Sequence, residues 1–339
     1  MNQTLDLHNK TIVISRTDSI GDVILTLPLC GWIKEACPSC KIIFLGRDYT
    51  LPVLECYPAI DRIESWNNYE NKSKEEQVAF FRSLQADIFI HVFPQKQIAK
   101  AVRKARIPKR VGTSHRLFHL LTCNIRPDFT RKKSELHEAQ LNFELLKPLG
   151  LHELPTLDEL RLQAAKFKPA GTLPSSFSNL LQTHGKRVIL HPKSQGSAVE
   201  WPLDKYISLA RKLIENDVHV YFSGTEKEGL MFRKALPEDK SITDISGRMT
   251  LKEFILFINQ CDALVACSTG PLHIAAYLGK KAVGLYTNVR PMHPGRWAPL
   301  GENSSVITLE NEKVSSLSPA EEIQRIETSV VLDSLKEIL

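Results

Sequence analysis

The sequence contains 339 residues, 42% hydrophobic and 24% charged, which is long enough for about two domains with sizeable apolar cores. Sixteen glycines and nineteen prolines are too few for a fibrous or low-complexity protein. The seven cysteines are an odd number, so we expect reduced thiols, as in the cytoplasm, and the sequence predicts neither a signal peptide nor a membrane-spanning helix. Cys37 and Cys40 form a CxxC, but no second Cys or His pair stands at metal-binding spacing, so we expect no metal there.

Positive charge is concentrated in one segment of the chain. The net charge is +6, but residues 96–133 contain twelve Lys and Arg and a single acid, Asp128, which gives this segment +11 and leaves the rest at −5. Such a segment predicts an anionic partner, and a solvated basic surface is the alternative. Only Phe118 and Phe129 stand among these cations, so base stacking is poorly supported and we expect no nucleic acid.

Apolar runs alternate with stretches of helical periodicity along the chain, which is typical of βαβ units. In the first half, strands are expected at 11–15, 41–45, 88–93 and 110–112, and helices at 51–57, 74–84, before 106, and at 136–149. A further helix begins near Ile20, and Pro28 should kink it. Residues 152–174 contain three prolines with little periodicity, which predicts a domain boundary in this region.

A second βα series follows in the other half. Strands are expected at 187–191, 218–223, 263–267 and 281–286, and helices at 204–215, 227–236, 251–260, 271–278 and 319–338. The pattern predicts an α/β protein with two Rossmann-like domains, each built on a mostly parallel sheet. Ligands of such sheets bind beyond the carboxyl ends of the strands, so the expected site is a cleft between the two domains.

The loop after the first strand contains one glycine, Gly21, followed by Asp22 in the first turn of the next helix. Gly21 lets the backbone approach a ligand closely, and the helix dipole favours a carboxylate at Asp22. Two interpretations stay open here, a catalytic carboxylate or simple capping of the helix by Asp18 or Asp22. A single glycine does not make a GxGxxG motif, so we expect no dinucleotide cofactor.

Two loops of the second half carry residue types that suit a phosphate. The loop at 191–202 offers an ammonium group, two hydroxyls and a glycine, namely Lys193, Ser194, Ser197 and Gly196. The loop after the strand at 263–267 opens a helix whose free N–H groups and dipole form an anion site. Its candidate residues are Thr269, Gly270 and His273, although a lone histidine at such a position more often has a structural role.

A third loop, at 223–228, carries carboxylates that could accept hydrogen bonds from ribose hydroxyls. The candidates are Glu228 and Glu226, next to Gly224. The alternative is that these acids only stabilise the first turn of the following helix.

Taken in order, these motifs resemble those of glycosyltransferase family 9, the ADP-heptose:lipopolysaccharide heptosyltransferases. The matching segments are Gly21-Asp22 to Pro28, His191-Pro192 to Trp201-Pro202, Gly224-Thr225 to Glu228, and the runs at 268–276 and 283–286. The helix that begins with Leu136-His137-Glu138 is similar as well, and the resemblance covers about residues 11–290.

The resemblance implies a GT-B fold with two facing Rossmann-like domains, an acceptor domain at 1–165 and a nucleotide-sugar domain at 175–318, with a helix at 319–339 packing back on the first domain. It implies inverting transfer of a heptose or related sugar from a nucleotide sugar, ADP-heptose in the family, to a lipopolysaccharide core or lipid A-type acceptor. It also implies that no metal takes part, and the chain contains no Asp-x-Asp motif. Asp22 matches the catalytic base of the family.

The resemblance also distributes roles among the candidate residues. These are Lys193, Ser194, Ser197, Thr269, Gly270 and His273 for the donor diphosphate; Gly224 and Glu228 for the nucleoside; Gly21, Val199 and Ser268 near the donor sugar; and Arg16, Lys109, Arg110 and Arg116 for the acceptor. Val199 and Ser268 stand where family members often have Lys and Asp, so a different donor sugar or a loss of activity stays open.

The expected partners are a nucleotide-sugar donor, an anionic glycolipid acceptor that meets the basic segment, and the inner leaflet of the cytoplasmic membrane, bound peripherally. Two alternatives come from other classes. One is a GT-B-like nucleotide-sugar epimerase or hydrolase, which needs no acceptor. The other is a non-catalytic protein that binds an anionic glycan or a nucleic acid.

Overall fold

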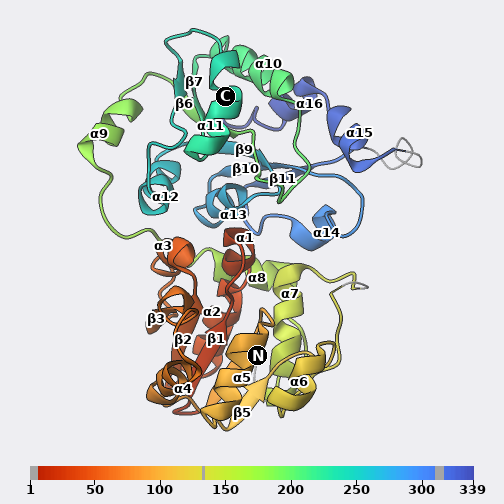
Figure 1. Ribbon diagram of the computed structural model, residues 1–339. Helices are drawn as coiled ribbons and strands as arrows, with labels where there is room; N and C mark the ends of the chain where they lie inside the picture. Colours follow the sequence, from red (N-terminus) through yellow and green to blue (C-terminus); the bar gives the residue numbers. More distant parts are fainter. Residues whose placement is uncertain (1–6, 132–133, 310–316) are drawn as a thin grey trace. The chain divides into compact units, whose positions relative to one another are not determined.

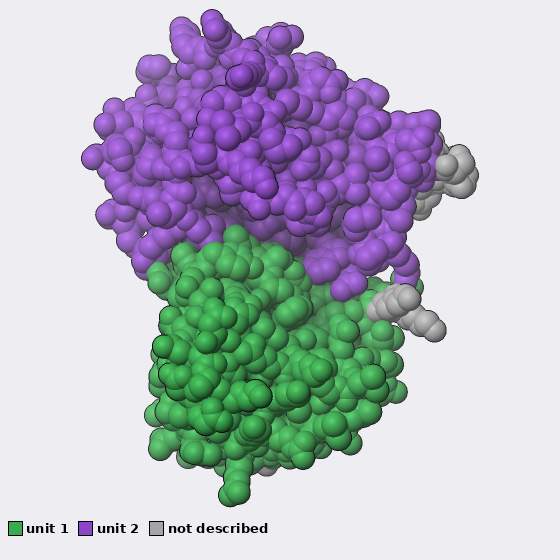
Figure 2. Space-filling view, viewed as in Figure 1, with its two compact units in different colours: residues 1–168 green, residues 169–339 purple. Residues whose placement is uncertain are grey.

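The computed structural model describes residues 7–131, 134–309 and 317–339, and the chain divides into two compact units, residues 1–168 and 169–339 (Figures 1 and 2). The division falls within the proline-containing stretch at 152–174. Two cations of the basic segment, Lys132 and Lys133, lie outside the described residues. Within the described ranges, no helix is long and apolar enough to cross a membrane.

Unit 1 is built on a parallel sheet, and its described part contains five strands in the order β3-β2-β1-β4-β5. The strands are β1 (Thr11–Ser15), β2 (Lys41–Gly46), β3 (Arg62–Ser65), β4 (Ile88–His91) and β5 (Lys109–Val111). β1 lies between β2 and β4, with Ile14 paired to Phe44 and Ile90. The strand order reverses between β1 and β4, and this reversal is where doubly wound sheets bind ligands.

The helices of unit 1 pack against this sheet (Figure 1). They are α1 (Ile20–Ile24), α2 (Leu27–Ala36), α3 (Leu51–Leu54), α4 (Lys74–Ser83), α5 (Lys96–Lys104), α6 (Leu117–Thr122), α7 (Glu138–Phe143) and α8 (Leu157–Ala164). Side chains of α4 and α5, such as Phe81 and Val102, share one buried cluster with Val13 and Phe89 of the central strands. α2 packs against α7 and α8, so helices from distant parts of the chain meet in one layer.

Two of the helices expected in unit 1 are divided. The helix near Ile20 ends at Ile24, and α2 begins at Leu27 with Pro28 at its start, where a missing N–H costs nothing. The helix expected at 136–149 is α7 followed by a 3₁₀ turn, η3 (Glu144–Leu149), which contains Pro148. Gly150 ends that turn with a φ of 107°, a left-handed conformation that favours glycine.

Unit 2 repeats the same architecture, and its described part contains a parallel sheet of six strands in the order β11-β10-β9-β6-β7-β8. The strands are β6 (Lys186–His191), β7 (Val218–Phe222), β8 (Ile242–Asp244), β9 (Ala263–Cys267), β10 (Lys281–Leu285) and β11 (Ser304–Ile307). The order reverses between β6 and β9, which pair directly, with His191 opposite Ala266. The loops that follow these two strands therefore begin side by side.

The helices of unit 2 are α9 (Ser175–Ser178), α10 (Leu203–Ile214), α11 (Glu226–Phe232), α12 (Leu251–Asn259), α13 (Gly270–Tyr277), α14 (Pro294–Trp297), α15 (Pro319–Gln324) and α16 (Thr328–Asp333). The buried cluster of this unit contains Val188 and Val265 of the sheet and Leu209 of α10. Continuous apolar runs in β6 and β9 fit a sheet that is covered on both faces.

The C-terminal segment differs from the expectation. It forms two short helices, α15 and α16, and its apolar residues Ile323 and Val331 belong to the core of unit 2 rather than to the first domain. α16 packs beside α10, as Figure 1 shows. The indole Nε1 of Trp201 donates to the carbonyl of Ile326 at 3.0 Å, and this bond lies where the single expected helix is interrupted.

Candidate active site

Asp22 lies in the first turn of α1, directly after the loop that leaves β1. Ser19 is the N-cap of this helix, because its Oγ accepts from the backbone N–H of Asp22 at 3.5 Å. The same hydroxyl donates to the Asp22 carboxylate. The alternative that Asp18 or Asp22 is the N-cap of this helix is therefore wrong. The Asp22 side chain is 19% exposed, so a substrate hydroxyl can reach it.

The buried guanidinium of Arg16 holds Asp22 from the other side. Its Nε donates to Asp18 Oδ1 at 2.8 Å, its Nη1 to Glu138 Oε1 at 3.1 Å, and its Nη2 to Asp22 Oδ1. Burial lowers the pKa of Arg16, but the charges of the three carboxylates outweigh it and raise the pKa above its ordinary value. A guanidinium with all three nitrogens engaged has a fixed position, so Arg16 also fixes the position of the Asp22 carboxylate.

Helix α7 supplies the support of this cluster. Glu138 is fully buried and also accepts from Nε of Arg131 at 2.9 Å. The amide Oδ1 of Asn142 accepts from Arg131 Nη2 at 3.1 Å, while its Nδ2 donates to the carbonyl of Leu25 at 3.2 Å. These contacts join α7 to the end of α1. The sequence counted Arg131 only among the cations of the basic segment and assigned no role to Glu138 or Asn142, and only the likeness of 136–138 to the family marked helix α7.

Carboxylates outnumber guanidinium groups in this cluster. Asp18, Asp22 and Glu138 face Arg16 and Arg131. Burial raises the pKa of Asp18 to about 6, although Arg16 acts in the opposite direction. With all five groups ionised, the cluster carries a net charge of −1.

In unit 2, the loop after β6 folds around an acid that the sequence did not single out. Glu200 Oε2 accepts from Lys193 Nζ at 2.9 Å, and Glu200 Oε1 accepts from the backbone N–H and the hydroxyl of Ser194 at 2.9 and 3.0 Å. Gln195 and Gly196 reverse the chain with φ values of 50° and 81°. The structure therefore brings Lys193 and Ser194 together around the Glu200 carboxylate. This carboxylate accepts the hydrogen bonds that a phosphate at the same place would accept.

The same loop is fixed at both ends. The Ser197 hydroxyl donates to the carbonyl of Ser194 at 2.8 Å, which closes the turn. His191 Nδ1 lies 2.9 Å from Ser223 Oγ at the end of β7, and burial lowers the pKa of His191 to about 4. At the other end, the backbone N–H of Trp201 donates to Cys267 Sγ at 3.3 Å. The loop is thus bonded to both neighbouring strands.

The loop between β9 and α13 lies beside it. Thr269 is the N-cap of α13, yet its side chain makes no capping bond, and its buried Oγ1 has no partner among the described residues. Gly270 and Pro271 open the helix, and His273 is buried in its first turn. The phenol of Tyr286, next to Ser268 in space, donates to the carbonyl of Trp297 at 2.6 Å. An unpartnered hydroxyl at a helix N-terminus is suited to an anion, as the sequence predicts for this loop.

The loop after β7 is organised as a helix cap. Thr225 is the N-cap of α11, and Glu228 Oε2 accepts from its backbone N–H at 2.7 Å and from its hydroxyl at 2.9 Å. The observed contacts of Glu228 are therefore those of an acid that stabilises the first turn of α11, which was the alternative to ribose binding. Gln195 Nε2 donates to Thr225 Oγ1 at 3.3 Å, so this loop, with Gly224, lies against the loop after β6.

The four acceptor candidates fall into two separate groups. Arg16 belongs to the carboxylate cluster, whereas the others lie on β5 or next to α6. Arg110 donates through Nε to the carbonyl of Thr122 at 2.8 Å and so binds the C-terminus of α6. Arg116 is exposed at the N-cap of that helix, and Lys109 is half-buried in β5.

The cysteines are not reactive groups of these loops, although Cys267 Sγ accepts from the backbone N–H of Trp201. All seven are free and buried, and burial raises the pKa of Cys40 to about 11. A protonated, buried thiol is a poor nucleophile and a poor metal ligand. Among the described residues, no group of three or more His, Cys, Asp and Glu side chains is arranged to hold a metal ion.

Two doubly wound parallel sheets with polar loops at their points of strand reversal define the GT-B class of glycosyltransferase folds. Solved structures agree with this class. The Escherichia coli ADP-heptose lipopolysaccharide heptosyltransferase II aligns with a TM-score of 0.76 over 97% of this chain and 98% of its own, at 19% identity. The Escherichia coli heptosyltransferase WaaC with ADP aligns with a TM-score of 0.71 over 97% and 100%, at 18% identity.

The chain belongs to glycosyltransferase family 9 (heptosyltransferase), whose sequence profile matches residues 80–326. It is similar to lipooligosaccharide heptosyltransferase 2 of Haemophilus influenzae, with 30% identity over 313 residues, 88% of each chain. It is also similar to lipopolysaccharide heptosyltransferase 3 of Escherichia coli, with 23% identity over 78% of this chain and 80% of the relative. The resemblance found in the sequence motifs and the expected fold class are thereby confirmed.

Proposed function

We propose that this protein is an inverting glycosyltransferase that moves a heptose or a related sugar from an ADP-linked donor to a lipopolysaccharide-type acceptor. The observation that carries the proposal is the Asp22 carboxylate, held by Arg16 and Ser19 beyond the carboxyl end of β1 and still accessible. An oriented carboxylate is what an acceptor hydroxyl needs as a proton acceptor. Membership of family 9 and the heptosyltransferase relatives support the choice of substrates.

In the proposed reaction, the acceptor hydroxyl attacks the anomeric carbon from the face opposite the nucleoside diphosphate. The bond from that carbon to the phosphate oxygen breaks with its electron pair, and the configuration is inverted through an oxocarbenium-like transition state. Asp22 takes the hydroxyl proton as the new bond forms. Arg16 and Ser19 hold one carboxylate oxygen each, so Arg16 acts as a positioning residue for Asp22.

The departing diphosphate is assigned to unit 2. Lys193, Ser194 and Ser197 come from the loop after β6, and Thr269, Gly270 and His273 come from the start of α13. Fixed donors of this kind stabilise negative charge as it develops, which is how the reaction would proceed without a metal ion. Because Glu200 accepts from Lys193 and Ser194, the diphosphate has to replace the Glu200 carboxylate at these donors.

The nucleoside and the sugar occupy the neighbouring positions in this proposal. Gly224 and the capping carboxylate of Glu228 line the nucleoside end, and Gly21, Val199 and Ser268 lie near the sugar. Val199 packs against the apolar core of unit 2, and Ser268 is a small, uncharged residue near the phenol of Tyr286. Neither side chain supplies a charge to sugar hydroxyls, so a donor related to ADP-heptose fits the proposal as well as ADP-heptose.

The acceptor is proposed to be an anionic glycolipid at the cytoplasmic face of the inner membrane, met by a peripherally bound protein. Lys109 and Arg116 are the candidate contacts to its acidic groups. Arg110 is left out of this proposed role, because its Nε and Nη1 already donate to the backbone carbonyls of Thr122 and Pro108.

The decisive experiment compares two neighbouring carboxylates that share Arg16. Asp22→Asn should lower kcat by about 10²- to 10⁴-fold, the usual contribution of a general base, with unchanged ADP affinity by calorimetry. Asp18→Asn is the matched control and should retain transfer. Product formation is followed as ADP release from ADP-heptose with a deacylated lipopolysaccharide core as acceptor, with and without EDTA, which should make no difference.

Full transfer by Asp22→Asn would refute the assignment of the base. Release of ADP that does not depend on the acceptor would instead indicate the nucleotide-sugar hydrolase or epimerase alternative. A requirement for added metal would refute the metal-independent mechanism while leaving the family membership intact.

A further inference from the structure

Helix α6 exposes a row of leucines on the surface of unit 1. Leu117, Leu120 and Leu121 are 85%, 50% and 71% exposed, whereas His119 and Thr122 are buried. Positions spaced by three and four residues lie on one face of a helix, so the three leucines form a continuous apolar face. We call this surface the leucine face. Contiguous exposed apolar surface of this kind marks an interaction site more often than isolated apolar residues do.

The structure holds this short helix firmly in place. Arg126 Nη1 donates to the carbonyl of Cys123 at 2.7 Å and to that of Leu120 at 3.3 Å, and Arg110 Nε donates to the carbonyl of Thr122 at 2.8 Å. Two guanidinium groups thus satisfy the last carbonyls of a helix that is too short to be stable alone. The leucines are therefore presented by an anchored helix.

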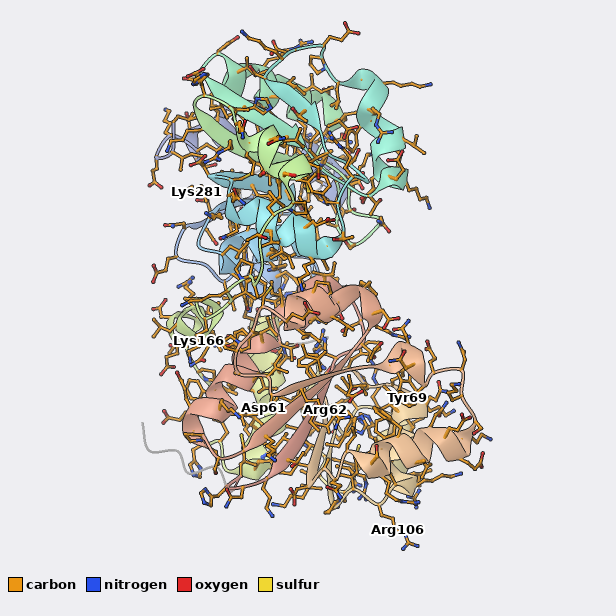
Figure 3. All side chains as sticks on the ribbon, turned by 90° about the vertical axis from the view of Figure 1, so that its left-hand side faces the viewer. Asp61, Arg62, Tyr69, Arg106, Lys166 and Lys281 are labelled. Carbon is orange, nitrogen blue, oxygen red and sulfur yellow. The ribbon has the colours of Figure 1, made fainter. Side chains whose placement is uncertain are left out.

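Cations surround the leucine face. α6 packs against α5, whose outer side exposes Lys100, Arg103 and Lys104. Asn124 Nδ2 donates to the carbonyl of Pro108 at 2.7 Å, which brings the turn after α5 close to the end of α6. Arg106 lies on that turn and points away from unit 1 (Figure 3).

The rim of the face is completed by exposed Arg116 and Arg126 at its two ends. The one acid of the segment, Asp128, is paired with His115 at 2.7 Å and with the Ser114 hydroxyl at 3.0 Å. The surroundings of the leucine face are therefore strongly positive.

We propose that the leucine face and its basic rim dock unit 1 on a bilayer that contains anionic phospholipid. The leucines enter the boundary between headgroups and acyl chains, and the Lys and Arg side chains meet lipid phosphates. The inference rests on the peripheral membrane binding in the proposed function and names the surface that carries it. A second copy of the chain is a poorer partner for the leucine face than an anionic bilayer, because two basic rims would repel each other.

The test uses the full chain and phosphatidylcholine vesicles with or without phosphatidylglycerol, separated by sedimentation. Wild type should bind the anionic vesicles, weakly at high salt, and hardly bind phosphatidylcholine alone. The variant L117Q/L120Q/L121Q keeps good helix formers and every charge, and it should bind anionic vesicles at least about tenfold more weakly.

The matched control is L162Q/L230Q/M231Q, which removes three apolar side chains of similar exposure, 63%, 68% and 63%, from other helices. It should bind vesicles as wild type does. Circular dichroism and ADP affinity check that both variants are folded, and ADP release with a water-soluble acceptor should be unchanged in both.

Equal vesicle binding by wild type and L117Q/L120Q/L121Q would overturn the inference. An absence of vesicle binding by wild type would also overturn the inference. In that case, transfer to a water-soluble acceptor would still support the proposed glycosyltransferase activity. A change from dimer to monomer in L117Q/L120Q/L121Q, measured by light scattering, would assign the leucine face to self-association instead and likewise overturn docking on lipid.

Discussion

Replacing Arg16 by lysine tests whether the carboxylate cluster acts as one unit. The substitution keeps the positive charge but offers one nitrogen where arginine offers three. Arg16 uses those three on three different carboxylates, those of Asp18, Asp22 and Glu138. A lysine therefore retains about one of these contacts and leaves two carboxylates with fewer donors.

The expected loss of stability follows from these contacts. A charge-assisted hydrogen bond contributes about 1.5–3 kcal/mol, so two lost bonds represent about 3–6 kcal/mol. Arg131 still donates to buried Glu138, and Asp18, with a pKa of about 6, takes up a proton readily, so a net loss of about 3 kcal/mol is expected. For a unit of 168 residues this corresponds to a fall in Tm of about 6–12 °C.

The assay is thermal unfolding followed by circular dichroism, together with the kinetics of transfer. Because Arg16 orients Asp22 and the donor loops lie in unit 2, kcat should fall while the affinity for ADP stays constant. Arg47→Lys is the matched control, since Arg47 also pairs with a carboxylate, Glu70, but at a partly exposed position worth about 0–1 kcal/mol. If Arg16→Lys unfolds at the same temperature as Arg47→Lys and keeps its kcat, Arg16 does not position Asp22 and the carboxylate cluster does not act as one unit.

Three further predictions concern unit 2. Glu200→Gln removes the charge that occupies Lys193, so calorimetry should show ADP binding about three- to tenfold tighter. Glu215→Gln, which changes an exposed acid at the C-cap of α10, should leave ADP binding unchanged. The pKa of His191 is about 4 in the folded state against 6.5 in the unfolded state, so its contribution is complete above pH 6.5 and is lost as the pH falls toward 4. His191→Asn removes this titration. Between pH 6.5 and 4, the free energy of unfolding of the variant, measured in urea, should therefore fall by up to about 3 kcal/mol less than that of wild type. Gly185→Ala places a Cβ 1.8 Å from a backbone carbonyl at a φ of 76° and should destabilise by more than about 2 kcal/mol, while Gly171→Ala, with open space around it, should cost about 1 kcal/mol.

Two central strands could be predicted from the sequence to the residue, and β4 and β6 to within two residues at one end. β1 and β9 have the expected bounds, 11–15 and 263–267, because continuous apolar runs identify strands that are buried on both faces. The edge strands β3, β8 and β11 were missed, since they are short and half-exposed and contain no apolar run. α8 was missed for a related reason, because its eight residues lie in a stretch between prolines, and its capping box of Thr156 and Glu159 was the available signal.

The environment of Asp22 could not be predicted, although its position could. Loop and helix placement follow from local patterns, but Arg16 and Glu138 are 122 residues apart in the chain, and no periodicity connects them. Their contact exists because α7 packs beside α2 once both cover the same sheet. The contacts of Arg16 with three carboxylates therefore follow from the packing of helices, which no local pattern in the sequence shows.

The loop after β6 shows that a cation in a sequence motif is not automatically available to a ligand. Lys193 and Ser194 have the residue types that suit a diphosphate, and both donate to the same carboxylate, that of Glu200. The turn at Gln195 and Gly196 brings Glu200 back onto both donors. A ligand at this loop has to compete with a carboxylate of the same chain, so the affinity of the site depends on the turn as much as on the cation. That competition makes Glu200→Gln the substitution that separates a working phosphate site from a loop that only resembles one.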